Sequence, residues 1–180
     1  PIFQVATMKE HDVPDWYIDS CNKIKYMFPR AHAVAYTMMS FRMAWYKVYY
    51  PQQFYATYFT TKVSNFDAET ILKGKDGILE KMEEINNKGT NASAKEKDDY
   101  TVLEVAYEMY ARGFEFTPAR LGKSSATKFD VEDGKVLLPF VAIEGVGENA
   151  AKAFAEEYKS KSFDTVEEAI IRAQIGRAHV

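Results

Sequence analysis

The sequence predicts a mainly α-helical protein that carries one small β-hairpin. Three observations predict this class. Apolar residues recur at helical spacing through most of residues 13–113, and these segments begin and end at recognisable helix-start and helix-stop residues. Apolar residues alternate around a single Asp-Gly turn later in the chain. With 180 residues, 47% of them apolar, the chain can bury a core as one domain or two small ones.

The first predicted helix covers residues 13–27. Asp12 is a favourable N-cap, and Pro14 suits a first helical turn. One stripe is expected to face inward, formed by Tyr17, Cys21, Ile24 and Phe28. Cys21 is the only cysteine, so a disulfide and a cysteine-based zinc site are excluded, and a buried structural role is expected.

The longest predicted helix covers residues 31–50 and stops at Pro51, which lacks a backbone donor. Its two faces differ in chemistry. The face expected to contact the core carries Val34, Met38, Phe41, Trp45 and Val48. The opposite face carries His32, Tyr36, Met39, Met43, Lys47 and Tyr50. From the pattern alone, a buried core helix whose charged groups reach solvent is favoured over a binding site.

Further helices are predicted over residues 53–60, from Asp67 to about residue 85, and from Ser93 to Gly113. The second has a shared apolar face, and Gly74 and Gly77 weaken its first half, where a kink or break is expected. The third begins with a capping box in which Ser93 and Glu96 satisfy each other's backbone donors. The inward residues of these two helices are predicted to be Ile71, Ile78, Met82 and Ile85, then Tyr100, Leu103, Tyr107 and Tyr110.

After Gly113 the composition shifts toward strands and turns. Asp133-Gly134 favours a tight hairpin turn, and Phe129, Val131, Val136 and Leu138 alternate around it. A soft boundary is therefore placed within residues 114–121. It separates a helical region, 1–113, from a hairpin-bearing region, 114–174.

Composition limits the possible functions. The formal net charge of −3 and the pI near 5.7 argue against a surface that binds nucleic acid everywhere, so any such contact must be local. No apolar run is long enough to span a membrane, and no secretory signal is present, so no membrane partner and a cytoplasmic location are expected. The mixed charges of residues 95–99 predict a solvated helix face and no metal site.

A basic residue and a histidine stand at the start of the long predicted helix, in Phe28-Pro29-Arg30-Ala31-His32. The first N–H groups of a helix lack internal partners, and the helix dipole leaves positive charge there. Phosphate is therefore a suitable ligand for this position.

This region resembles the bacterial replicative DNA polymerase III alpha subunit, C-type (PolC). The resemblance rests on residues 12–18, residues 25–36 and the segment Phe41 to Tyr50. It implies that residues 1–113 form the helical fingers region. Arg30, His32 and Tyr36 would contact incoming nucleotide or DNA, and Lys47 is assigned with them. The family often has lysine where Arg30 stands, which keeps the charge but changes the geometry.

A second signal lies in residues 143–154, which resemble a helix-hairpin-helix motif. Its glycines allow a sharp turn and close approach of the backbone to a ligand. Backbone contacts with DNA are expected from Gly145, Val146, Gly147 and Asn149, with Lys152 as a local positive charge. Such a hairpin holds DNA without reading its bases. The alternative is that Gly-Val-Gly is only the turn that begins a helix.

The resemblance implies a fragment of a DNA-directed DNA polymerase that positions incoming dNTP and primer-template DNA. No catalytic residue is expected here, because the palm aspartates that bind Mg²⁺ lie outside the sequence, so the fragment alone should be inactive. The implied partners are the palm and the sliding clamp. Two alternatives remain: a free-standing, non-enzymatic helix-hairpin-helix DNA-binding module, and a helical protein-interaction domain.

Residues 175–180 read Ile-Gly-Arg-Ala-His-Val and resemble a translated sequencing adapter. They are expected to be artefactual and receive no functional role. Because the chain begins with Pro1, we expect it to be a piece of a longer protein.

Overall fold

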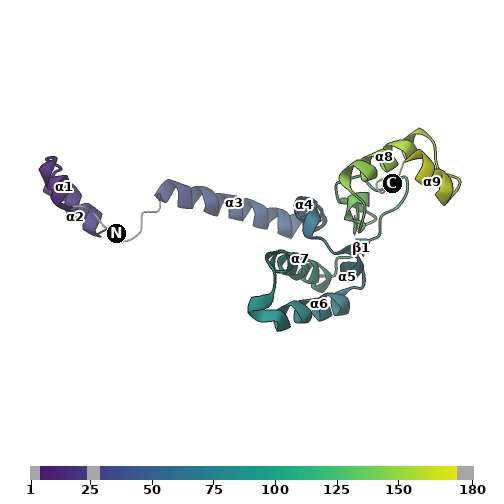
Figure 1. Cartoon of the computed structure of the whole chain (residues 1–180), viewed down its shortest axis with the longest axis horizontal. Coiled ribbons are helices and arrows are strands. Elements are labelled where there is room, and N and C mark those ends of the chain that lie inside the picture. The colour runs from purple at the N-terminus through teal and green to yellow at the C-terminus, as the bar shows by residue number, and fades with distance from the viewer. Residues whose placement is uncertain (1–4, 24–28, 174–180) are drawn as a thin grey trace. The chain divides into compact units, whose positions relative to one another are not determined.

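A computed structural model describes residues 5–23 and 29–173 and confirms the mainly helical class (Figure 1). The chain divides into two compact units, Pro1–Ala44 and Trp45–Val180, which are treated separately below. The elements in chain order are α1 (Val5–Glu10), α2 (Asp15–Lys23), α3 (Arg30–Tyr49), α4 (Pro51–Thr61), η1 (Val63–Asn65), α5 (Ala68–Leu72), α6 (Lys75–Lys88), η2 (Gly89–Asn91), α7 (Ala94–Ala111), β1 (Phe116–Thr117), β2 (Asp130–Glu132), β3 (Lys135–Leu137), η3 (Phe140–Ala142), α8 (Glu148–Ser160) and α9 (Val166–Arg172).

The first unit contains a helix that the sequence analysis missed. Helix α1 precedes the predicted one, and Asp12 ends it instead of capping the next. Asp12 has a left-handed φ of 55°, its N–H donates to the Lys9 carbonyl, and the Val13 N–H donates to the Met8 carbonyl. This pair of bonds is a Schellman motif, in which the left-handed residue closes the helix C-terminus. The prediction of Asp12 as an N-cap was therefore wrong.

Helix α2 begins two residues later than predicted, at Asp15. Ile18 is its buried residue, whereas Tyr17 is 48% exposed and Cys21 is half-buried. The predicted inward stripe is thus displaced by one residue, because Ile18 occupies the packed side of the helix. Ile24, Phe28 and the predicted helix end at 27 lie outside the described residues.

Helix α3 is continuous and ends before Pro51, as predicted. Its predicted core face was wrong, since the helix has no buried residue. Phe41 is 73% exposed, and Val48 is 63% exposed. The pattern of α3 therefore identifies side chains that need a partner surface, which the described residues do not provide. The exposed residues of the predicted core face are Val34, Met38, Phe41, Trp45 and Val48.

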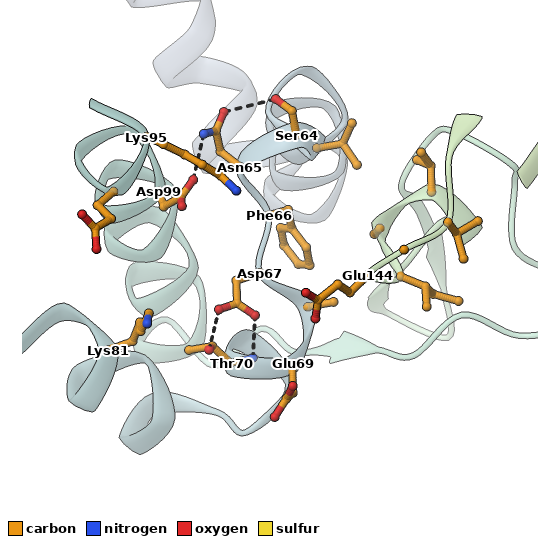
Figure 2. Close-up of a pocket in the computed structure, with 18 of the residues that line it drawn as sticks. Ser64, Asn65, Phe66, Asp67, Glu69, Thr70, Lys81, Lys95, Asp99 and Glu144 are labelled. Carbon is orange, nitrogen blue, oxygen red and sulfur yellow. Dashed lines mark hydrogen bonds between the residues drawn. The ribbon is translucent and has the colours of Figure 1, made fainter. Parts of the chain in front are cut away.

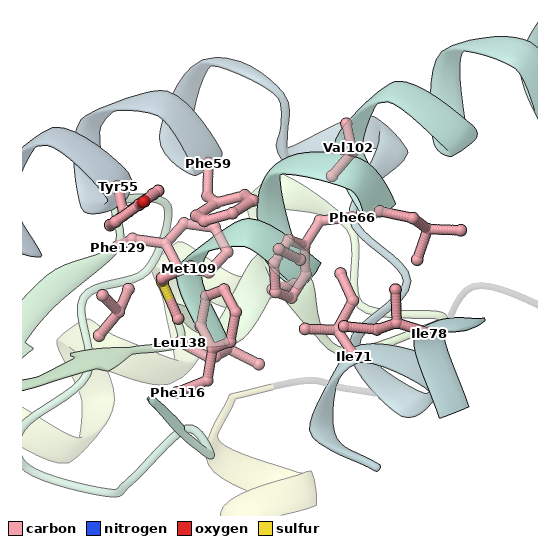
Figure 3. Packing of buried hydrophobic residues seen from close by; sticks show 14 of the residues in the cluster. Tyr55, Phe59, Phe66, Ile71, Ile78, Val102, Met109, Phe116, Phe129 and Leu138 are labelled. Carbon is pink, nitrogen blue, oxygen red and sulfur yellow. The ribbon is translucent and has the colours of Figure 1, made fainter. Parts of the chain in front are cut away.

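Five aromatic side chains, Tyr55, Phe59, Phe66, Phe116 and Phe129, are among the buried core residues of the second unit (Figure 3). Phe59 of α4 is fully buried, and its ring centroid lies 5.0 Å from that of Phe116. Phe66 meets Phe129 at 4.8 Å, edge to face. Edge-to-face pairs place the positive ring edge against the negative face, which adds to the free energy gained from apolar burial. The buried residues of this core lie both before and after residues 114–121 in the sequence.

Residues 67–111 follow the predicted helical pattern closely. Gly74, with φ 84°, separates α5 from α6 where a break was expected. Ser93 and Glu96 form the complete capping box at the start of α7. The predicted inward residues are buried or half-buried, and α6 and α7 lie side by side in Figure 1. Gly113, with φ 83°, follows the end of α7 as expected.

The predicted hairpin is present and is extended by a third strand. Strands β2 and β3 pair antiparallel, with Val131 opposite Val136, and both turn residues, Asp133 and Gly134, have positive φ. The sequence analysis missed β1, which pairs parallel to β3 and gives the order β1-β3-β2. The Phe129 N–H donates to Thr60 Oγ1 at 3.0 Å, which connects this region to α4.

The predicted boundary at 114–121 therefore does not mark a gap in packing, because the core and a hydrogen bond cross it. It stays a prediction about functional regions.

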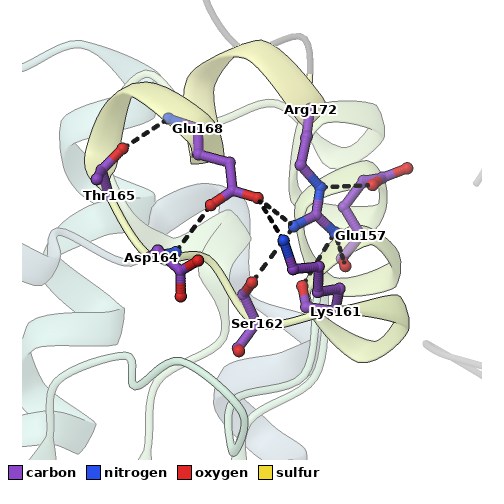
Figure 4. A network of polar contacts seen from close by, with 7 residues as sticks. All are labelled: Glu157, Lys161, Ser162, Asp164, Thr165, Glu168 and Arg172. Carbon is purple, nitrogen blue, oxygen red and sulfur yellow. Dashed lines mark hydrogen bonds and ion pairs between the residues drawn. The ribbon is translucent and has the colours of Figure 1, made fainter.

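Helices α8 and α9 are joined by a polar network (Figure 4). The guanidinium of Arg172 donates to the Glu157 carboxylate and carbonyl, to Glu168, and to the carbonyls of Lys161 and Ser162. The Thr165 hydroxyl accepts from the Glu168 N–H, and the Glu168 carboxylate accepts from the Asp164 N–H. Among the described residues, no helix is long and apolar enough to cross a membrane.

Candidate nucleic-acid interface

Three of the predicted nucleotide contacts lie in the first two turns of α3. Arg30 is the first residue of this 20-residue helix, and Arg30, His32 and Tyr36 are all exposed. The spacing of four residues places His32 and Tyr36 on one side of the helix. Their rings meet edge to face with centroids 4.4 Å apart. The helix start thus presents a cation beside an imidazole and a phenol.

Lys47, the fourth predicted contact, is ion-paired with another residue of the second unit. Its ammonium lies 2.6 Å from Glu108 Oε2 of α7 and 5.4 Å from the centre of the Phe54 ring. Its carbonyl accepts a bond from Arg112 at 3.2 Å. Arg112 also donates to the Tyr55 hydroxyl at 3.0 Å. For Lys47 to contact a phosphate, its ion pair with Glu108 would have to open.

The predicted glycine hairpin connects η3 to α8. Gly145 has φ 81°, a conformation that strongly favours glycine. Gly147 is the N-cap of α8, with φ −72° and ψ 160°, so its backbone would accept other residues. Ala151 is fully buried, and its small side chain allows close packing. The start of α8 therefore presents free backbone N–H groups beside a tight turn.

The charged side chains near this hairpin favour phosphate binding less than its backbone geometry does. Asn149 and Lys152 are exposed on α8, and Lys152 lies 2.5 Å from the carboxylate of Glu148. Glu148 is also the first residue of the helix, where an anion competes with a phosphate for the same N–H groups. Exposed pairs at this spacing are weak, so Lys152 can exchange partners at small cost.

A pocket of about 740 Å³ lies beside the hairpin, and the sequence analysis did not foresee it (Figure 2). Residues 144–147 line one part of it. Five carboxylates and two ammonium groups also line it: Asp67, Glu69, Glu96, Asp99 and Glu144, then Lys81 and Lys95.

Several of the carboxylates in this pocket have structural roles. Asp67 caps α5 through the Thr70 N–H, and Asp99 accepts from Asn65. Hydrogen bonds from Lys88, and then from Ser93, lower the pKa of Glu96 to about 2, so this group stays ionised. The excess of negative charge disfavours phosphate in this pocket. Among the described residues, no group of three or more His, Cys, Asp or Glu could hold a metal ion.

Comparison with known proteins agrees with the hairpin geometry. A family model described as a helix-hairpin-helix motif matches residues 113–180. Among curated proteins, the DNA polymerase III PolC-type of Clostridium perfringens is 50% identical over 172 residues, 96% of this chain and 12% of that protein. Those of Caldanaerobacter subterraneus and Bacillus subtilis are 49% and 45% identical, over 97% and 94% of this chain and 12% of each protein.

Fold and site together define a helical protein segment that carries a helix-hairpin-helix motif. By sequence, this segment belongs to the PolC-type DNA polymerase III family, which confirms the resemblance stated above. The chain spans 12% of the length of these relatives.

Proposed function

We propose that this chain is part of a DNA-directed DNA polymerase, in which it positions incoming dNTP and primer-template DNA. The observation that carries the proposal is the match to PolC-type polymerases over 96% of the chain. The helix-hairpin-helix geometry at Gly145 and Gly147 supports the DNA-binding part.

At the nucleotide end, the start of α3 would bind the triphosphate. Arg30 supplies a fixed positive charge, and the helix N-terminus supplies a positive dipole end. His32 and Tyr36 stand one turn apart in edge-to-face contact, so each ring limits the rotation of the other. Such an arrangement orients a substrate before reaction without entering the chemical step. Lys47 would join only after leaving Glu108.

At the DNA end, the turn at Gly145 to Gly147 would approach the sugar-phosphate backbone. Val146 is half-buried and fixes the turn, while Gly145, Gly147 and Asn149 are exposed. Backbone donors do not distinguish bases, which suits an enzyme that copies any sequence. Lys152 would exchange Glu148 for a phosphate when DNA binds.

The described residues do not fit the Mg²⁺ ions that nucleotidyl transfer implies, since they contain no grouping of ligands that could hold a metal. We propose that this Mg²⁺ binds palm carboxylates elsewhere in the parent protein. The palm, primer-template DNA, dNTP and the sliding clamp are the proposed partners, without a membrane, in the cytoplasm. The 180-residue chain alone should not incorporate nucleotides.

Substitution in an intact parent polymerase tests the nucleotide end. His32→Ala should raise the nucleotide KM or lower kcat about 5- to 30-fold, the equivalent of one lost charged or aromatic contact. Thr37→Ala is a matched control, because its hydroxyl bonds the Ala33 carbonyl on the same helix. Unchanged steady-state kinetics for His32→Ala would contradict the assignment.

A non-enzymatic DNA-binding module is the second candidate, and the presence of the whole hairpin within one compact unit favours it. Extending the gene in both directions separates the two. An upstream segment with paired aspartates supports the polymerase, whereas native start and stop codons at these ends support the module. The exposed apolar surface of α3 favours the third candidate, a protein-interaction domain, which predicts no salt-dependent DNA binding.

A further inference from the structure

A second pocket includes Phe140, in the chain segment that leads into the hairpin. It has a volume of about 330 Å³ and is formed by the loop 122–126 together with α8. Three lysines line it, Lys123 from the loop and Lys152 and Lys159 from α8, against one carboxylate, Glu156. This excess of positive charge is opposite in sign to that of the pocket beside Gly145.

The loop that forms this pocket is held in one conformation. Gly122 has φ 77°, and a Cβ there would lie 2.9 Å from the ring of Tyr158, so the glycine allows the loop to lie against α8. The buried hydroxyl of Ser124 donates to the Leu138 carbonyl and accepts from the Arg120 N–H. Because these bonds are already made, the pocket needs little reordering to receive a ligand.

Backbone bonds fix the other side of the loop. The Phe140 N–H donates to the Ser125 carbonyl, and the Val141 N–H donates to the Ala126 carbonyl. These bonds connect the loop directly to η3, the element before the glycine hairpin. The pocket and the hairpin are therefore attached to the same short segment.

The lysines of this pocket differ in how firmly they are held. Lys123 pairs with Glu132, which Arg120 also contacts, so Glu132 keeps a partner if Lys123 moves. Lys152 pairs with Glu148 on the exposed side of α8. Lys159 is exposed in the last turn of α8. The pair of Lys152 with Glu148 is exposed on both sides and contributes little, so a phosphate can replace it, whereas Lys123 must leave the mostly buried carboxylate of Glu132.

We propose that this pocket binds a phosphate group of the DNA backbone through Lys123, Lys152 and Lys159. The inference rests on the proposed DNA-binding function and adds a second contact to the one at the glycine hairpin. A phosphodiester is the preferred source, because lysines from a loop and a helix that line one pocket can leave Glu132 and Glu148 and contact neighbouring phosphates of a continuous strand. The Ser125 hydroxyl, at the half-buried edge of the pocket, supplies a further donor.

The test measures binding of the full 180-residue chain to a fluorescent primer-template duplex by anisotropy, at several salt concentrations. Lys123→Gln/Lys159→Gln should weaken binding several-fold and reduce the slope of log K against log salt by about 1 for each lysine. Lys97→Gln on α7 removes one exposed charge that does not line this pocket, and should change neither quantity. Lys159→Arg keeps the positive charge, so it should bind the duplex with the affinity and salt slope of the unmodified chain.

Two measurements control for folding and for the source of phosphate. Thermal unfolding followed by circular dichroism should give the same midpoint for Lys159→Gln as for the unmodified chain. Amide chemical shifts of residues 122–126 should move on titration with duplex DNA at micromolar concentration. Equal shifts with inorganic phosphate and none with DNA would overturn the assignment to a nucleic-acid backbone.

The outcomes separate this inference from the proposed function. If the unmodified chain binds DNA, Gly145→Ala weakens it and the lysine variants match the Lys97→Gln control, the pocket assignment is wrong. If the lysine variants weaken binding and Gly145→Ala does not, the hairpin role is wrong and the pocket stands. If the unmodified chain shows no salt-dependent DNA binding, both are wrong.

Discussion

Helices α3 and α4 are neighbours in the chain, are both rich in aromatic residues, and differ completely in burial. Phe59 and Tyr55 of α4 are fully buried, whereas α3 has no buried residue. Phe41 of α3 is 73% exposed. The same kind of apolar pattern thus has two outcomes within 32 residues, in helices that only Tyr50 separates.

The difference shows what an apolar pattern does and does not predict. It identifies the residues whose transfer from water is favourable, but not the surface that receives them. Helix α4 finds that surface in Phe66, Phe116 and Phe129 of the same unit. Large contiguous apolar exposure such as that of α3 marks an interaction surface.

The largest expected effect compares the two helices directly. Phe59→Ala should lower the free energy of unfolding of the second unit by about 3–5 kcal/mol, because it removes a ring from the packed core and leaves a cavity. Phe41→Ala should change the free energy of unfolding of its own unit, the first, by less than about 0.5 kcal/mol, because the ring is 73% exposed to water already. Urea titration followed by near-ultraviolet circular dichroism measures both. Equal losses for the two variants would break the comparison.

The second prediction compares two glycines in the same hairpin. Gly145→Ala should destabilise the second unit by about 1–2 kcal/mol, because alanine is strained at φ 81°. Gly147→Ala is the matched control: its φ is −72° and a Cβ there meets no atom within 4 Å. Thermal unfolding of the two variants should therefore differ by several degrees. If Gly147→Ala were the more damaging, the turn geometry would be wrong.

The third prediction concerns the start of α7. Ser93→Ala should lower the free energy of unfolding of the second unit by about 1 kcal/mol, because the Glu96 N–H loses its acceptor. Ser93→Asp, which keeps an acceptor at the N-cap, should retain most of the stability. The midpoint of urea unfolding measures both changes. A loss confined to α3 and absent from the second unit would contradict the prediction.

The smallest expected effect is a pH dependence that belongs to the second unit. The pKa of Glu96 is lowered to about 2, chiefly by its hydrogen bond from Lys88, against an ordinary value of 4.5. Its stabilising contribution is therefore complete above about pH 4.5 and is lost as the pH falls through about 2. Helix α3 contains no acidic residue. Thermal midpoints between pH 6 and 2 should fall less steeply for Glu96→Gln.

Local signals explain the features that were predicted correctly. Ser93 with Glu96, Gly74 and Asp133-Gly134 each act through hydrogen bonds or backbone angles within a few residues, so the sequence contains the whole cause. The helical class and the hairpin belong to this group.

Tertiary causes explain the features that were missed. Asp12 was misassigned because its role is set by α1 behind it, and β1 was missed because two residues form too short a strand to show alternation. The ion pair of Lys47 with Glu108 joins residues 61 positions apart. The second pocket brings together lysines from a loop and a helix, so no single segment shows it.

The Arg172 network has a consequence for the electric field around α8. By donating to the carbonyls of Glu157 and Lys161, its guanidinium satisfies acceptors at the C-terminal end of that helix and neutralises the negative dipole end. The N-terminal end, at Gly147, keeps its unpaired donors. Helix α8 therefore has its carbonyl end bonded to Arg172, while the donors at its other end, beside Glu148, stay directed toward the glycine hairpin.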